Sequence, residues 1–151
     1  MGELFGTPAH PLLVHIPIVL LPLLAVAAIA MAVKPALRSR LTWVLFGTTL
    51  ITAAVTYWAT QAGQHLRNAL QPALGTKADR HMELGNQTAL LATIFFVGAA
   101  CMVVMNHWFK RLTRSATVLA WVVALVGVVA AVWVIRTGHE GARITWDGVN
   151  L

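Results

Sequence analysis

Long apolar stretches separated by short polar connections run along the whole chain. Four such stretches contain no Asp, Glu, Lys or Arg, and they cover Pro11–Val33, Leu41–Ala62, Leu84–Asn106 and Ser115–Ile135. Each has close to the about 20 residues that an α-helix needs to cross the hydrocarbon core of a bilayer. The pattern therefore predicts an all-α membrane protein with four transmembrane helices.

The connections between these stretches predict how the helices pack. The first connection, Lys34–Arg40, and the third are short, which favours an up-down-up-down four-helix bundle. The middle connection, Gly63–Glu83, is longer, and we expect it to form a loop that caps one end of the bundle. Only short loops and tails remain outside the four spans, so we expect residues 1–151 to form a single transmembrane domain.

The charged residues predict the orientation of the bundle. The connections after the first and third spans carry six basic and no acidic side chains: Lys34, Arg38, Arg40, Lys110, Arg111 and Arg114. All five acidic residues lie in the other connecting or terminal segments. The positive-inside rule then places both termini and the middle connection outside the cytoplasm. The net charge of +6 follows from this topology and from contact with anionic lipid headgroups, and we expect no nucleic-acid partner.

Histidines gather on the predicted outer side. Five of the six lie there, at the ends of the apolar stretches: His10, His15, His65, His81 and His139. Ionisable side chains at membrane depth are typical of functional sites, and imidazoles bind metal ions and haem iron. The cluster therefore predicts a cofactor site near the outer face.

His15 and His81 are the predicted axial ligands of a haem iron. They begin the first and third spans, which are diagonal partners in an up-down bundle and lie roughly 11–14 Å apart. Two imidazoles that meet at one iron fit this gap, whereas two alone would leave a zinc ion short of its usual four ligands. Pro17 frees the carbonyl of Leu13, which can accept the ring N–H of His15. Gly85 leaves space for the edge of a flat macrocycle one turn beyond His81.

A second site is predicted nearer to the aqueous boundary. His65 and His139 end the second and fourth spans on the other diagonal, and His10 lies in the same outer layer. Two haems at one height would collide in a four-helix core. We therefore expect one haem in the core, and a second haem, a metal ion or proton exchange at these three residues. Four arginines at this level can pair with haem propionates or extend towards lipid headgroups: Arg67, Arg80, Arg136 and Arg143.

Small and hydroxyl-bearing side chains recur along two of the predicted helices. Small residues that let helices approach closely follow the fourth span at intervals of three or four: Ala116, Ala120, Ala124, Gly127 and Ala131. Threonines recur at every fourth position of the second span: Thr48, Thr52, Thr56 and Thr60. We interpret the hydroxyls of Thr48 and Thr52 as bonded to carbonyls of the preceding turn. For Thr60 the sequence leaves open a role in lining a cofactor site.

The stretch HPLLVHIPI at His10–Ile18 resembles the opening signature of a bacterial family of four-helix membrane proteins known as domain of unknown function 2231. The resemblance extends to the polar start of the third span, His81–Asn86, and to the glycine-rich ending, Gly138–Leu151. Similar members occur alone or linked to Rieske-type or c-type cytochrome modules, which implies respiratory electron transfer. For this chain, the resemblance implies a separate redox partner of that kind.

We therefore expect a multi-pass protein of the bacterial inner (cytoplasmic) membrane that holds b-type haem and passes electrons between the quinol pool and an extracytoplasmic acceptor. Cys101 is the only cysteine, which excludes covalent haem attachment through a CxxCH motif. Two alternatives stay open: a membrane protein that binds or transports zinc or copper, and a structural subunit of a respiratory complex. The sequence also leaves open a homodimer, and whether the chain is an electron carrier or an oxidoreductase subunit.

Overall fold

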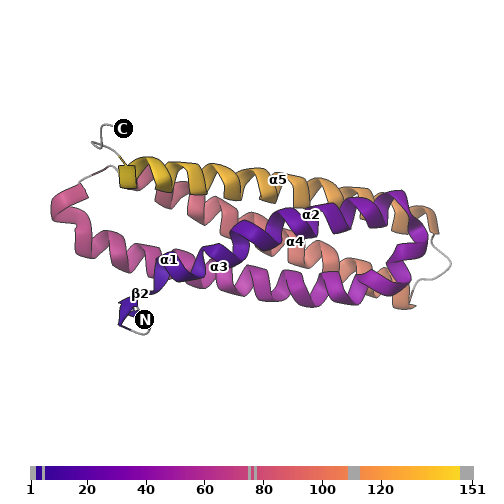
Figure 1. Cartoon of the computed structure of the whole chain (residues 1–151). Coiled ribbons are helices and arrows are strands. Elements are labelled where there is room, and N and C mark those ends of the chain that lie inside the picture. The colour runs from indigo at the N-terminus through magenta and orange to yellow at the C-terminus, as the bar shows by residue number, and fades with distance from the viewer. Residues whose placement is uncertain (1–2, 5, 75, 77, 109–112, 147–151) are drawn as a thin grey trace.

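A computed structural model of the chain describes residues 3–4, 6–74, 76, 78–108 and 113–146. Four long helices form a bundle (Figure 1): α2 (His15–Val33), α3 (Arg38–Leu74), α4 (Asp79–Trp108) and α5 (Thr113–Trp146). The five-residue helix α1 (Ala9–Leu13) precedes α2, and a short 3-10 turn, η1 (Pro35–Leu37), joins α2 to α3. Four helical segments are long and apolar enough to cross a membrane, so the predicted fold class is confirmed.

A small hairpin leads into α1. Strand β1 (Glu3–Leu4) pairs antiparallel with β2 (Thr7–Pro8), and Glu3 lies opposite Pro8. Gly6 in the turn has a φ of 76°, in the left-handed region that glycine adopts without a steric cost.

Contacts between the helices define the diagonals of the bundle. Helix α2 packs against α3 and α5, and α4 packs against the same two helices. Helices α2 and α4 therefore lie across one diagonal, and α3 and α5 lie across the other, which is the arrangement predicted from the sequence. The orientation of the bundle relative to a membrane stays a prediction. Lys110 and Arg111, two of the six basic residues that support it, lie outside the described residues.

The centre of the bundle is apolar and closely packed. Phe95 and Met31 are completely buried, and large apolar side chains on the outside, such as Val26 and Leu125, are exposed, as suits a surface that contacts lipid. A Cβ atom added at Gly127 would lie 2.8 Å from the Phe95 ring and 3.2 Å from the Cα atom of Ala25 on α2. The small residue at this position therefore allows α2 and α5 to approach closely, as predicted.

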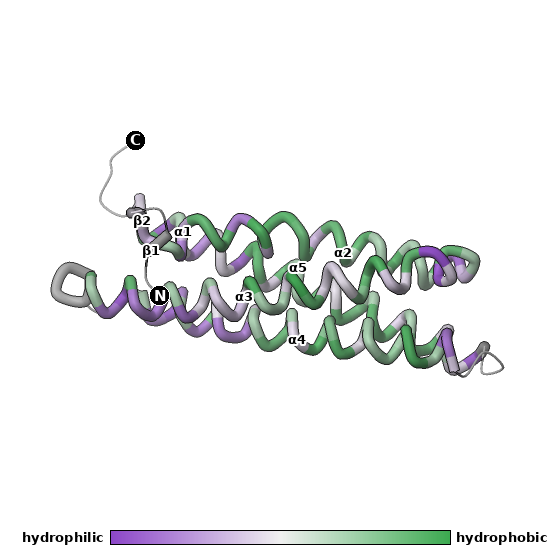
Figure 2. The backbone as a smooth tube through the Cα atoms, turned by 90° about the horizontal axis from the view of Figure 1, so that it is seen from below, coloured by the Kyte–Doolittle hydropathy of each residue, from purple (hydrophilic) through white to green (hydrophobic). Residues whose placement is uncertain are grey.

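Helices α3, α4 and α5 extend beyond the predicted spans, and α4 begins at Asp79 rather than at Leu84. Helix α3 ends at Leu74 rather than near Ala62, and α5 ends at Trp146 rather than near Ile135. The prediction of a long loop over residues 63–83 is wrong, because most of this segment is helical. Figure 2 shows that these extensions are hydrophilic. Apolar length measures the part of a helix that crosses lipid, whereas residues such as Gln, Leu, Arg and Ala continue the helix into water.

The threonines on α3 bond to their own helix. Thr48 donates to the carbonyl of Val44, and Thr52 donates to that of Thr48 at 2.7 Å. The hydroxyl of Thr56 likewise donates to the Thr52 carbonyl at 2.6 Å, and that of Thr60 to the Tyr57 carbonyl at 2.7 Å. The interpretation of Thr48 and Thr52 is confirmed, and the hydroxyls of Thr56 and Thr60 also donate to backbone carbonyls of the preceding turn.

Arg38 is buried at the end of the bundle that the charges place inside. Its side chain is only 7% exposed, although the sequence placed it in a surface connection. Its Nε donates to the carbonyl of Met31 at 3.0 Å, and Nη1 donates to the Thr117 hydroxyl at 3.2 Å. Met31 belongs to the last turn of α2, whose carbonyls lack helical partners and favour a positive charge. Arg38 therefore caps α2 and ties it to α5.

Candidate cofactor site

The helix that begins the first span is interrupted at Val14, between α1 and α2. Pro17 has no N–H group to donate to the carbonyl of Leu13, which explains why the helical hydrogen-bond pattern stops there. Ala9 and Leu13 are buried in a small apolar cluster with Ala59 of α3. Helix α1 lies against α3, and α2 packs against both α5 and α3.

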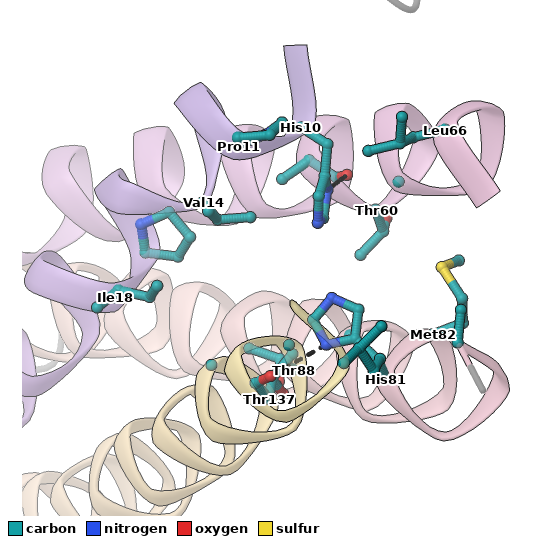
Figure 3. Close-up of a pocket in the computed structure, with 18 of the residues that line it drawn as sticks. His10, Pro11, Val14, Ile18, Thr60, Leu66, His81, Met82, Thr88 and Thr137 are labelled. Carbon is teal, nitrogen blue, oxygen red and sulfur yellow. Dashed lines mark hydrogen bonds between the residues drawn. The ribbon is translucent and has the colours of Figure 1, made fainter. Parts of the chain in front are cut away.

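A cavity of about 590 Å³ opens at this end of the bundle (Figure 3). All five helices contribute to its lining, which is mainly apolar and includes Val14, Ile18 and Val134. Small-molecule and cofactor sites are typically concave, mostly apolar and about 300–1,000 Å³ in volume. The cavity therefore has the size and character of a cofactor site.

The imidazoles of His10 and His81 project into this cavity from opposite sides (Figure 3). His10 lies on α1 and His81 on α4, and their ring centroids are 5.8 Å apart with an interplanar angle of 87°. Two imidazoles bound to one metal, at about 2.0–2.1 Å from each nitrogen, would have their centroids roughly 6 Å apart. The observed spacing therefore suits two ligands of a single metal atom.

Both rings are fixed by a backbone carbonyl on a neighbouring helix. Nδ1 of His10 lies 2.8 Å from the carbonyl oxygen of Ala59, and Nδ1 of His81 lies 3.0 Å from that of Thr137. A carbonyl oxygen only accepts hydrogen bonds, so Nδ1 carries the hydrogen in each ring. In a neutral imidazole, the other nitrogen, Nε2, then has a free lone pair. Metal-binding histidines are typically oriented by such a bond.

A glycine packs against each of the two rings. A Cβ atom added at Gly63 would lie 2.9 Å from Nδ1 of His10, and one added at Gly141 would lie 3.0 Å from Cε1 of His81. Each glycine lies four residues after the carbonyl that the ring binds, and so one turn above it on the same face of its helix. The absence of a side chain at Gly63 and Gly141 therefore gives the imidazole access to that carbonyl.

Two further glycines border open space. A Cβ atom added at Gly85 would meet Thr60 at 3.8 Å, and one added at Gly138 would meet Ile18 at 3.9 Å, both ordinary contact distances. Both glycines line the cavity. Gly85 therefore leaves room beside His81, as predicted, and close helix packing does not require a glycine there.

The other histidines have different surroundings. His15 lines the cavity but is exposed, and its ring forms no hydrogen bond with the described residues, so the predicted bond to Leu13 is not observed. His65 and His139 are exposed on α3 and α5 and are not among the described residues that line the cavity. The geometry thus pairs His81 with His10, where the sequence paired it with His15.

No group of three or more His, Cys, Asp or Glu side chains arranged to hold a metal ion occurs within the described ranges. The cavity instead offers the two facing imidazoles of His10 and His81. Such a pair suits a metal whose other ligands come from a bound cofactor, as in haem. Gly63 and Gly141 have no role that the sequence pattern predicts; the available signal is that each is a glycine on a helix next to the one that carries His10 or His81.

The family described as Predicted membrane protein (DUF2231) matches residues 6–149, which include every cavity residue named above. The chain belongs to this family. As a DUF2231 member with four helices able to cross a bilayer, it is a multi-pass membrane protein in contact with lipid. No curated protein and no solved structure matches the chain significantly.

Proposed function

We propose that this DUF2231 protein binds b-type haem between His10 and His81 and transfers electrons between the quinol pool and an extracytoplasmic acceptor. The observation that carries the proposal is the pair of facing imidazoles, with both Nδ1 atoms bound to carbonyls and both Nε2 atoms free. Two neutral imidazoles are the axial ligands of many low-spin b-type haems, and bound haem would supply one-electron redox chemistry.

The surroundings of the pair support a flat apolar ligand. Apolar side chains and glycines, among them Gly85 and Gly138, leave the space next to His81 open. The nearby hydroxyl of Thr88 donates to the carbonyl of Leu84 at 2.8 Å, so it does not require a partner from the ligand. The apolar lining would contact the macrocycle, and the carbonyls of Ala59 and Thr137 would hold the two rings and keep their tautomers fixed.

The location of the cavity supports exchange of electrons at a membrane surface. The cavity lies at the end of the bundle where α3 and α5 continue beyond the apolar stretches that end at Ala62 and Ile135. By the positive-inside rule this end faces outward, towards a separate Rieske-type or c-type cytochrome partner. The membrane of this proposal is the bacterial inner membrane, and quinol is the donor.

The decisive experiment is optical spectroscopy of protein purified from haem-replete cells. We expect a coloured protein with a low-spin, six-coordinate ferrous spectrum after reduction and a pyridine haemochrome typical of haem b. Reconstitution with added haem controls for loss during purification. A protein that stays colourless after reconstitution and contains zinc or copper by elemental analysis would favour the metal-binding alternative instead.

The haem-to-protein ratio tests the second site. His65 and His139 are exposed on opposite diagonal helices, so a second haem at these residues would have to lie outside the described cavity or between two copies of the chain. A ratio near two, which falls to one in His65→Ala or His139→Ala, would establish that site. A ratio of one in all three proteins would leave a single haem between His10 and His81.

A further inference from the structure

Arg67 lines the cavity and is charged. Among the described residues that do so, Arg67 on α3 is the sole Arg, Lys, Asp or Glu. The other three arginines considered from the sequence are exposed elsewhere: Arg80, Arg136 and Arg143. The guanidinium of Arg136 lies over the Trp133 ring, 4.9 Å from its centroid, and Arg143 pairs with Glu140 at 3.3 Å.

Arg67 gives the cavity a charged end. It lies four residues beyond Gly63, the glycine that packs against His10, so it is one helical turn, about 6 Å, further along α3 and on the same face. In the opposite direction the lining includes His15 as well as Thr56 and Thr88, whose hydroxyls are already bonded to their own helices, and it is otherwise apolar, as at Val134. A ligand between the imidazoles therefore has an arginine beside one edge and a mainly apolar surface beside the other.

The guanidinium of Arg67 retains capacity for another acceptor. Its Nε donates to Oδ1 of Asp79 at 3.0 Å, and its Nη2 donates to the same oxygen. Nη1 forms no hydrogen bond with the residues that the structure describes. The side chains of Arg67 and Asp79 are 29% and 48% exposed, and ion pairs exposed to this degree contribute little stability. Asp79 can therefore share Arg67 with a second carboxylate.

We propose that Arg67 binds a carboxylate of the ligand held between His10 and His81, and so sets the orientation of that ligand in the cavity. This inference rests on the proposed function. The carboxylates of haem b are its two propionates, which project from one edge of the macrocycle. That edge points along α3 towards Arg67, and the apolar edge points towards Thr56 and Val134. The planar guanidinium suits a carboxylate better than a lysine would.

The test compares two forms of haem that differ only in the carboxylates. The full-length protein, freed of haem, is titrated with protohaem and with its dimethyl ester, and binding is followed by the Soret absorbance. We expect the wild type to bind protohaem about tenfold more tightly than the ester, since a hydrogen bond to a charged group is worth about this factor. In Arg67→Gln this preference is lost, and in Arg67→Lys it is reduced.

Two control variants separate ligand binding from other effects. Arg143→Gln removes an outer arginine that is not among the described residues of the cavity lining, and it keeps the preference. Asp79→Asn disrupts the ion pair but leaves Arg67 in place, so it also keeps the preference. An unchanged preference in folded Arg67→Gln, or its loss in Asp79→Asn, would overturn the inference while leaving the imidazole site intact. Wild-type protein that binds neither haem form would overturn the proposed function, and this inference with it.

Discussion

Gly63 and Gly141 have the same relation to the two cavity imidazoles. Each lies four residues after a carbonyl, that of Ala59 or of Thr137, which accepts the Nδ1 hydrogen of a histidine on another helix. The arrangement occurs once on α3 for His10 and once on α5 for His81. Helices α3 and α5, which carry neither His10 nor His81, thus orient both rings, and Gly63 and Gly141 make this possible.

Substitution of these glycines should weaken haem binding without removing a ligand. In Gly63→Ala the new methyl group would lie 2.9 Å from Nδ1 of His10, so the ring must shift and its bond to the Ala59 carbonyl is disturbed. We expect a loss of about tenfold or more in haem affinity, as is typical when the partner of a ligating histidine is lost. Gly85→Ala serves as the control, because its methyl group would meet Thr60 at an ordinary 3.8 Å. Equal affinities in both variants, measured by titration, would contradict this account.

Removal of either facing imidazole should abolish the low-spin spectrum. His10→Ala and His81→Ala each leave one axial ligand, whereas His15→Ala and His107→Ala leave the facing pair intact. Optical and electron paramagnetic resonance spectra of the four purified variants make the comparison. A six-coordinate spectrum that persists in His10→Ala and disappears in His15→Ala would return the ligand role to the pair predicted from the sequence.

A large side chain at an open glycine should block the cavity while the fold survives. Gly138 lines the cavity, and a Cβ atom there meets only the tip of Ile18 at 3.9 Å. We expect Gly138→Leu to retain its helical circular dichroism and to bind haem at least tenfold more weakly, because the leucine occupies the space of the ligand. Gly138→Ala, which adds one methyl group at contact distance, should bind nearly normally. Unimpaired binding by Gly138→Leu would show that the ligand lies elsewhere.

Arg38 should contribute to stability and not to the cofactor site. Arg38→Met removes the hydrogen bonds to Met31 and Thr117 and leaves the end of α2 without its cap. We expect the free energy of unfolding to fall by about 3 kcal/mol or more, since two hydrogen bonds from a charged donor are lost and each is worth about 1.5–3 kcal/mol. Chemical denaturation in detergent measures the change. Arg40→Met, at an exposed position, should change it by no more than about 0.5 kcal/mol.

The orientation in the membrane can be tested by thiol labelling. After Cys101 is replaced by serine, we expect a cysteine at Glu3 to react with an impermeant reagent in intact spheroplasts and one at Arg40 to react only in inverted vesicles. The opposite pattern would place His10 and His81 on the cytoplasmic side and exclude an extracytoplasmic acceptor.

The bundle could be predicted because apolar length and short connections determine it. The ends of the helices could not be predicted, because the apolar stretches end at Ala62 and Ile135, whereas helices α3 and α5 continue to Leu74 and Trp146. The position of His81 near the start of the third long helix followed from the pattern as well. The choice between His10 and His15 did not, because it depends on access to a carbonyl of another helix. This access leaves no periodic signal in the sequence.

The separation of His10 and His81 along the chain has a consequence for the stability of the whole bundle. His10 belongs to the short helix α1, which lies against α3, whereas His81 belongs to α4. A ligand bound to both imidazoles therefore joins the first short helix of the chain to α4, which begins near the middle of the sequence. Since only the completed bundle presents both rings, such a ligand favours the folded state by mass action. The thermal midpoint of unfolding should then rise with ligand concentration. The absorption band of haem bound to both imidazoles should appear only when the bundle has assembled completely.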